Sequence, residues 1–107
     1  MRNLTEKQKI GLIGENISAK HLAKQGFKIL ARNYRKKWGE IDIIAEKDNI
    51  LYFFEVKSVS CEPRNQGYMP EENVHSWKAK RLSRTIKTYL AERQVSDETE
   101  FKIGIIA

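Results

Sequence analysis

The sequence of 107 residues predicts an α/β domain in which two helices flank a mixed central sheet. Three observations predict this class. A helical pattern covers residues 5–25, runs rich in β-forming residues occupy the segment 27–57, and a second helical pattern precedes one last strand. We therefore expect the element order αβββαβ in a single domain that covers residues 1–107.

The first helix is expected to begin at Thr5-Glu6-Lys7-Gln8, which has the form of a capping box, and to end at Gly26. Glu15 falls on an apolar side of this helix, between Leu12 and Ala19. A glutamate in that position is either held by a salt bridge or belongs to a functional site. Both interpretations stay open at this point.

The middle of the chain predicts three strands joined by short turns. A basic turn is expected at residues 35–39, and Asp48-Asn49 is a tight-turn signal. Residues 58–69 have the composition of a mobile loop. The expected strands are residues 27–32, 40–46 and 50–57.

The second helix is expected to begin at Pro70-Glu71-Glu72, because Pro and acidic residues are favoured in a first turn. It runs to about Arg93 and precedes a strand over residues 101–107. Lys78 lies in the middle of its apolar face, where an unpaired ammonium would be costly. Lys78 either extends outward along the helix or points toward a carboxylate partner, and we favour the second alternative.

The charge of the chain is unevenly distributed. The net charge of +6 divides into +7 over residues 1–40, −4 over 41–75 and +3 over 76–107. Basic flanks suit a nucleic acid, because neutralising phosphates releases counterions, although an ordinary solvated surface explains the net charge equally well. Trp38 or Trp77 could stack on an exposed base. The candidate nucleic-acid-binding residues are Arg35, Lys36, Lys37, Lys78, Lys80, Arg81, Arg84 and Lys87.

Other features of the sequence restrict the class of protein. No apolar run approaches the roughly 20 residues of a membrane span, and the N-terminus lacks the apolar stretch of a signal peptide. The single Cys61 cannot form an internal disulfide. We therefore expect a soluble cytoplasmic protein.

A candidate site follows if the second and third strands form a hairpin around a two-residue turn at Asp48-Asn49. Asp42 then lies across from Glu55, and Lys57 projects on the same side as Glu55. A one-residue slip would separate them. Two close carboxylates beside apolar residues favour a bound cation, and their hard oxygen ligands suit Mg²⁺ or Mn²⁺. The alternative is an exposed Glu–Lys pair, with Asp42 paired elsewhere.

The segment Gly39-Glu40-Ile41-Asp42 followed by Glu55-Val56-Lys57 resembles the signature of the PD-(D/E)xK nuclease superfamily. Nearly the whole chain resembles the YraN-like family of small bacterial proteins, which is similar to the archaeal Holliday-junction resolvases. The further segments that carry this resemblance are Gly14-Glu15, Arg32-Asn33-Tyr34-Arg35 and Pro70…Lys78…Arg81-Leu82…Tyr89-Leu90.

The resemblance implies a restriction-endonuclease-like core and a metal-dependent endonuclease that hydrolyses phosphodiester bonds in DNA. It implies Asp42, Glu55 and Lys57 as catalytic residues. It also implies Mg²⁺ or Mn²⁺ held by Asp42, Glu55, Val56 and Glu15. Branched or junction DNA is the substrate that the resemblance favours, with DNA preferred over RNA, and a homodimer is expected because the resolvases act as dimers.

Two departures from the family pattern keep a non-catalytic alternative open. Val59 stands where relatives usually carry Arg, and Glu100-Phe101-Lys102-Ile103 replaces an Arg-Phe-Asp-Val-like strand. The second hypothesis is therefore a non-catalytic nucleic-acid-binding module on the same scaffold. The third is a protein–protein adaptor whose basic surface binds an acidic partner.

Overall fold

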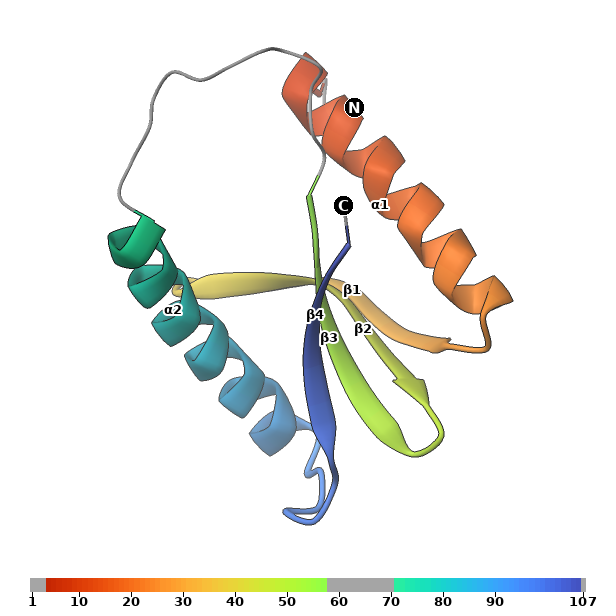
Figure 1. Cartoon of the computed structure of the whole chain (residues 1–107), viewed down its shortest axis with the longest axis vertical. Coiled ribbons are helices and arrows are strands. Elements are labelled where there is room, and N and C mark those ends of the chain that lie inside the picture. Colours follow the sequence, from red (N-terminus) through yellow and green to blue (C-terminus); the bar gives the residue numbers. More distant parts are fainter. Residues whose placement is uncertain (1–3, 58–70, 107) are drawn as a thin grey trace.

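The computed structural model describes residues 4–57 and 71–106. The order αβββαβ is confirmed, and the four strands form one mixed sheet in the order β1-β2-β3-β4, in which only β3 and β4 are parallel. The sheet lies between the two helices (Figure 1). The loop expected at 58–69 lies outside the described residues. The elements are α1 (Glu6–Lys24), β1 (Lys28–Lys36), β2 (Gly39–Lys47), β3 (Ile50–Val56), α2 (Glu71–Glu92) and β4 (Phe101–Ile106).

Helix α1 has the predicted ends. The Thr5 hydroxyl accepts a hydrogen bond from the Gln8 N–H at 3.1 Å, and the Gln8 side chain accepts one from the Thr5 N–H at 2.9 Å. Gly26 ends the turn with a φ of +96°, a conformation that costs glycine little. The helix buries Glu15 and Leu22 toward the sheet. A capped, well-terminated helix therefore places one carboxylate inside the protein.

The β2–β3 hairpin has the predicted two-residue turn. Asp48 and Asn49 have φ values of +54° and +66°, the left-handed pair that tight hairpins require. The strand pairing runs from Lys47↔Ile50 to Ile43↔Phe54, which confirms the predicted register over these pairs. Regular pairing ends there, one position before Asp42 and Glu55.

The β1–β2 hairpin differs from its prediction. Arg35 and Lys36 belong to β1, where they pair with Glu40 and Gly39, so the basic turn is shorter than residues 35–39. Backbone pairing outweighs the local charge here. A Cβ atom on Gly39 would lie 2.6 Å from the Thr85 hydroxyl, so only glycine lets this turn pack so closely against α2.

The sheet has a buried core on each face. Ile41 and Ile44 belong to the core beneath α2, which also contains Phe53, Ile86 and Tyr89. Ile43 belongs to the core on the α1 side, with Leu22 and Ala45. Because Ile41 and Ile44 are three residues apart yet share a face, the alternation of side chains along β2 breaks between them.

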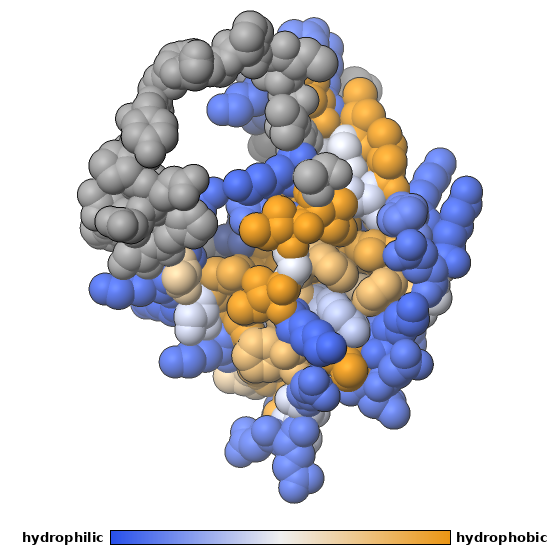
Figure 2. Space-filling model, viewed as in Figure 1, coloured by the Kyte–Doolittle hydropathy of each residue, from blue (hydrophilic) through white to orange (hydrophobic). Residues whose placement is uncertain are grey.

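Strand β4 forms one edge of the sheet and is incompletely covered, because α2 packs chiefly on β2. Figure 2 shows hydrophobic residues gathered where β4 runs, with hydrophilic residues on both flanks. Phe101, Ile103 and Ile105 are 42%, 54% and 62% exposed. In the part of the chain that the structure describes, no helix is long and apolar enough to cross a membrane.

Candidate functional site

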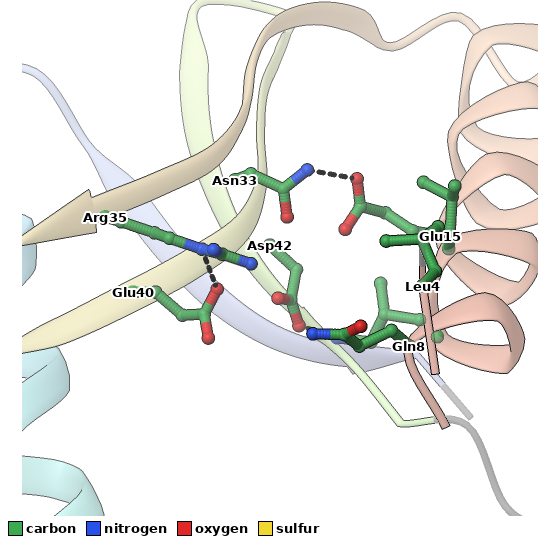
Figure 3. A pocket seen from close by; sticks show the side chains of 10 residues that line it. Leu4, Gln8, Glu15, Asn33, Arg35, Glu40 and Asp42 are labelled. Atoms are coloured by element: carbon green, nitrogen blue, oxygen red, sulfur yellow. Dashed lines mark hydrogen bonds and ion pairs between the residues drawn. The ribbon is translucent and has the colours of Figure 1, made fainter. Parts of the chain in front are cut away.

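A pocket of about 310 Å³ lies between α1 and the sheet (Figure 3). Its lining comes from α1, β1, β2 and the end of β3, so four elements must be in place to form it. Most of its polar groups are carboxylates and their hydrogen-bond donors. The polar lining residues are Gln8, Glu15, Asn33, Arg35, Glu40 and Asp42.

Glu15 is fixed in this pocket by donors from β1. Its Oε1 accepts hydrogen bonds from Arg32 Nε at 3.0 Å and Asn33 Nδ2 at 2.9 Å, and Arg32 Nη2 lies 2.8 Å away. Asn33 has a φ of +53°, a conformation that asparagine tolerates better than most residues. Glu15 is only 7% exposed. The salt bridge expected for a buried glutamate is therefore present, and the same side chain also lines the pocket.

Asp42 is held differently. Its Oδ2 accepts a hydrogen bond from the Val56 N–H at 2.7 Å. Burial raises the pKa of Asp42, the Val56 hydrogen bond opposes this shift, and the charges of Glu40, Glu15 and Glu55 raise the pKa further. Asp42 is thus surrounded by negative charge, and a bound cation would stabilise its ionised form.

Glu55 lies on the other side of the sheet. Its carboxylate is 3.5 Å from the Lys78 ammonium of α2, so the expected counter-charge for Lys78 is confirmed. The expectation that Asp42 and Glu55 share a face is wrong, because the alternation along β2 breaks at Asp42 and leaves it on the α1 side. The two carboxylates remain close enough for Glu55 to raise the pKa of Asp42.

Lys57 follows β3 directly and is exposed. Its backbone N–H donates to the Ile106 carbonyl at 2.8 Å, which ties the end of β3 to β4. Its ammonium makes no ion pair with any residue that the structure describes. Lys57 is therefore a cation without an ionic partner among the described residues, at the end of the strand that carries Glu55.

The donor set fits a hydrated hard cation better than a closed metal cage. Among the side chains that the structure describes, those of residues 4–57 and 78–106, no three of His, Cys, Asp or Glu are grouped as metal ligands. Glu15 and Asp42 nevertheless line the same pocket. Mg²⁺ is usually bound by one or two carboxylates, with water and substrate phosphates completing its octahedron. These two residues would hold such an ion, beside Val56.

A second cavity of about 740 Å³, the basic cleft, lies between the β1–β2 turn and α2. The Arg84 guanidinium lies 4.2 Å from the centroid of the Trp38 ring. Arg35 and Glu40, paired at 3.0 Å, line both this cleft and the carboxylate pocket. The candidate nucleic-acid-binding residues in the cleft are Arg35, Lys36, Lys37, Arg81 and Arg84.

The remaining candidate binding residues lie along α2. Lys80 and Lys87 line a shallow depression beside Arg84. Lys78 pairs with Glu55 instead. The structure thus brings most of the predicted basic residues to one end of the molecule, around the β1–β2 turn and the neighbouring surface of α2.

Sequence reasoning missed the contribution of Arg32 and Asn33 to the pocket. Both lie in a segment that supports the family resemblance, but no spacing rule links them to Glu15, which is on another element. The only local signal is that asparagine tolerates the left-handed conformation that position 33 adopts.

The fold and the pocket define the class of protein: an α/β chain with a restriction-endonuclease-like core and a carboxylate pocket beside its first helix. The chain belongs to the uncharacterised protein family UPF0102, whose family model matches residues 14–107. This confirms the resemblance to the YraN-like family, a PD-(D/E)xK-like group.

Relatives cover most of the chain. A UPF0102 protein of Campylobacter hominis is 40% identical over 94% of this chain and 84% of its own length. One of Campylobacter fetus is 45% identical over 90% of this chain and 80% of its own. A UPF0102 protein of Lachnoclostridium phytofermentans is 36% identical over 90% of this chain and 79% of its own length. These names state family membership and no activity.

Proposed function

We propose that the protein is a metal-dependent, endonuclease-type phosphodiester hydrolase that acts on DNA. The observation that carries this proposal is the position of Asp42. It is a partly buried carboxylate among other carboxylates, in a pocket that shares the Arg35–Glu40 pair with a basic cleft. A pocket that attracts cations beside a cleft that attracts phosphates suits phosphoryl chemistry.

The reaction is hydrolysis. The oxygen of water bonds to phosphorus, the bond from phosphorus to one ester oxygen breaks, and the leaving oxygen takes up a proton. When bound, Mg²⁺ or Mn²⁺ supplies Lewis acidity and neutralises negative charge on the phosphate. In this proposal Glu15 and Asp42 hold the ion.

The other residues position these groups and bind substrate. Arg32 and Asn33 fix the Glu15 carboxylate, and the Val56 N–H fixes that of Asp42. Lys57 is the cation that we assign to the negative charge developing on the phosphate. Glu55, the third carboxylate of the resemblance, keeps a proposed role in the site, although it also forms an ion pair with Lys78 at 3.5 Å.

The test is a cleavage assay with metal-stripped protein. Labelled linear, flapped and four-way DNA are incubated with it before and after Mg²⁺ or Mn²⁺ is added. We expect cleavage only with metal, and a fall of about 10²–10³-fold in Asp42→Asn and Lys57→Ala, because each removes an essential charge. Glu98→Gln and Lys20→Gln, which change exposed charges elsewhere, are matched controls. Undiminished cleavage in both site variants would overturn the assignment.

The resemblance to resolvases adds two finer proposals, a branched substrate and a homodimer. Preference for the four-way or flapped DNA in the same assay tests the first. Sedimentation equilibrium tests the second, and a monomer at all concentrations contradicts it.

The alternative is a nucleic-acid-binding module without catalysis. The ion pair between Glu55 and Lys78 favours it, because a carboxylate engaged with Lys78 is less available to bind a metal ion together with Asp42. This alternative predicts salt-dependent DNA binding and no cleavage of any substrate with either metal.

A further inference from the structure

The basic cleft contains a flat stacking pair as well as positive charge. The side chain of Trp38, at the β1–β2 turn, is partly exposed, and the Arg84 guanidinium lies over its ring at 4.2 Å. Indole rings and guanidinium planes are the protein groups on which nucleic-acid bases stack. The pair therefore offers more than charge to a ligand.

The cations of the cleft exceed its carboxylates. Glu40 is the one acidic residue among the described residues that line it, and Arg35 already pairs with Glu40. Lys37 has no partner among the residues that the structure describes, and Arg84 has no carboxylate partner there. Such an excess attracts a polyanion, since each neutralised phosphate releases a counterion.

Two observations argue against a purely structural role for Trp38. Its Nε1–H is buried and has no hydrogen-bond acceptor in the described part of the chain. Buried tryptophans usually find one, so the fold tolerates a cost at this position. The turn that carries Trp38 is also fixed closely against α2 by Gly39, which holds the ring at a defined place on the cleft wall.

We infer that the basic cleft binds an unpaired nucleotide of a DNA strand, with its base on the Trp38–Arg84 pair and its phosphates on Lys37 and the neighbouring cations. This inference deepens the proposed function and depends on it for the identity of the polyanion. Bases inside a duplex already stack on their neighbours, so only unpaired or terminal bases can occupy such a platform. The cleft would then select DNA with single-stranded features, and the adjoining pocket would receive the neighbouring phosphate.

The test is binding without catalysis, in EDTA, to a fluorescein-labelled 12-nucleotide single strand and to the matching duplex. Trp38→Leu keeps apolar volume but removes the stacking surface. We expect it to weaken binding of the single strand about 5- to 100-fold and of the duplex by less than about twofold. Arg84→Gln should weaken both, and Lys20→Gln is the control for loss of one distant charge. Equal binding by Trp38→Leu and Lys20→Gln, or equal losses for both DNAs, would overturn the inference.

A second measurement remains informative if Trp38→Leu does not fold. Trp77→Phe leaves Trp38 as the one tryptophan of the chain, so its fluorescence reports on the cleft alone. Saturating single strand should quench this emission, and an unchanged spectrum would overturn the inference. Because neither experiment requires cleavage, stacking without any hydrolysis would contradict the proposed hydrolase and leave the cleft assignment standing.

Discussion

The two sides of the sheet present opposite electrostatic environments built from the same β1–β2 hairpin. On the α1 side, Asp42 and Glu15 line a pocket rich in carboxylates. On the α2 side, Lys37 and Arg84 line an open, basic cleft. Figure 3 shows the Arg35–Glu40 pair, which lines both cavities, on the pocket side. A single hairpin can therefore serve chemistry on one face and binding on the other.

The two regions also differ in how their polar groups are satisfied. Glu15 has three donor atoms around one carboxylate oxygen, whereas the buried N–H of Trp38 finds no acceptor among the residues that the structure describes. A satisfied group stabilises the fold, and an unsatisfied one is a cost that function can explain. Four variants compare the two regions, from the largest expected change in stability to the smallest.

Glu15→Ala should give the largest loss. It removes the shared acceptor of Arg32 and Asn33 inside the protein, and hydrogen bonds to a charged group contribute about 1.5–3 kcal/mol each. We expect urea unfolding to show a loss of about 2–3 kcal/mol. Asn16→Ala, which removes an exposed contact of the same Arg32, should cost under about 1 kcal/mol. Equal losses would mean that the pocket side is not held together through Glu15.

Gly39→Ala should disrupt the cleft side. The added Cβ would lie 2.6 Å from the Thr85 hydroxyl and 3.3 Å from the Arg81 carbonyl, so the turn must move away from α2. We expect a loss of about 1–3 kcal/mol in urea unfolding, together with weaker DNA binding. Gly11→Ala is the matched control, since nothing lies within 4 Å of its added Cβ, and it should stabilise α1 by about 0.5–1 kcal/mol. A Gly39→Ala variant as stable as the wild type would refute the close packing.

Asp42→Asn should stabilise the protein at neutral pH. Because the folded-state pKa of Asp42 is raised above its ordinary value of 3.8, the folded state binds the proton more tightly than the unfolded state. Stability is therefore lost as pH rises from about 3.8 through the raised pKa, and the neutral amide avoids that loss. Thermal melts should show a gain of a few degrees at pH 7 that disappears near pH 3. A lower Tm at pH 7 would contradict this assignment of charge.

Glu92→Gln tests a carboxyl group whose pKa is lowered, in contrast to that of Asp42, and it should give the smallest change in stability. Hydrogen bonds from Lys36 and Tyr34, at 2.6 and 2.5 Å, lower the pKa of Glu92. The ionised Glu92 therefore stabilises the folded state above the pKa of the unfolded chain, about 4.5. This stabilisation is lost as pH falls through the lowered pKa of the folded state. We expect Tm to fall by about 1–2 °C at pH 7, since the carboxylate is exposed and screened by solvent. No difference should remain at strongly acidic pH, and a gain at pH 7 would contradict the prediction.

The partner of Glu92 carries its own signature. Burial, followed by the hydrogen bond to Glu92, raises the pKa of Tyr34 to about 12. Spectrophotometric titration of the tyrosines should show one with this high pKa in the wild type, lowered in Glu92→Gln because the acceptor charge is lost. An unchanged titration would mean that the contact does not form in solution.

Local patterns predicted much of the fold. The capping box at Thr5, the left-handed Gly26 and the turn at Asp48-Asn49 are each set by a few neighbouring residues, so the helix end and the β2–β3 register followed from sequence. The length of β1 could not be predicted in the same way. Backbone pairing with β2 adds the basic residues Arg35 and Lys36 to the strand, although their local sequence favours a turn.

The candidate site was predicted less completely, because it depends on contacts between elements. Regular alternation of side chains along a strand predicts that Asp42 and Ile44 lie on the same face of the sheet. The alternation breaks between Ile41 and Ile44, and no residue type in this segment indicates the break. The donors of Glu15 come from another strand, and one of them requires a positive φ at Asn33. The basic residues of the cleft come from two separate stretches of the sequence, and only the packing of the β1–β2 turn against α2 brings them together.

The central claim is that the carboxylate pocket carries out hydrolysis and that the basic cleft binds DNA. The most direct test of this claim measures two quantities on the same samples. These are the single-turnover cleavage rate at saturating protein and the dissociation constant in EDTA, both with flapped DNA. Asp42→Asn should slow cleavage about 10²–10³-fold and change the dissociation constant by no more than about twofold. Trp38→Leu should weaken binding at least about fivefold and leave the saturated rate within about twofold of wild type. Parallel losses of rate and affinity in both variants would contradict the account, since they would mean that the two regions do not act separately.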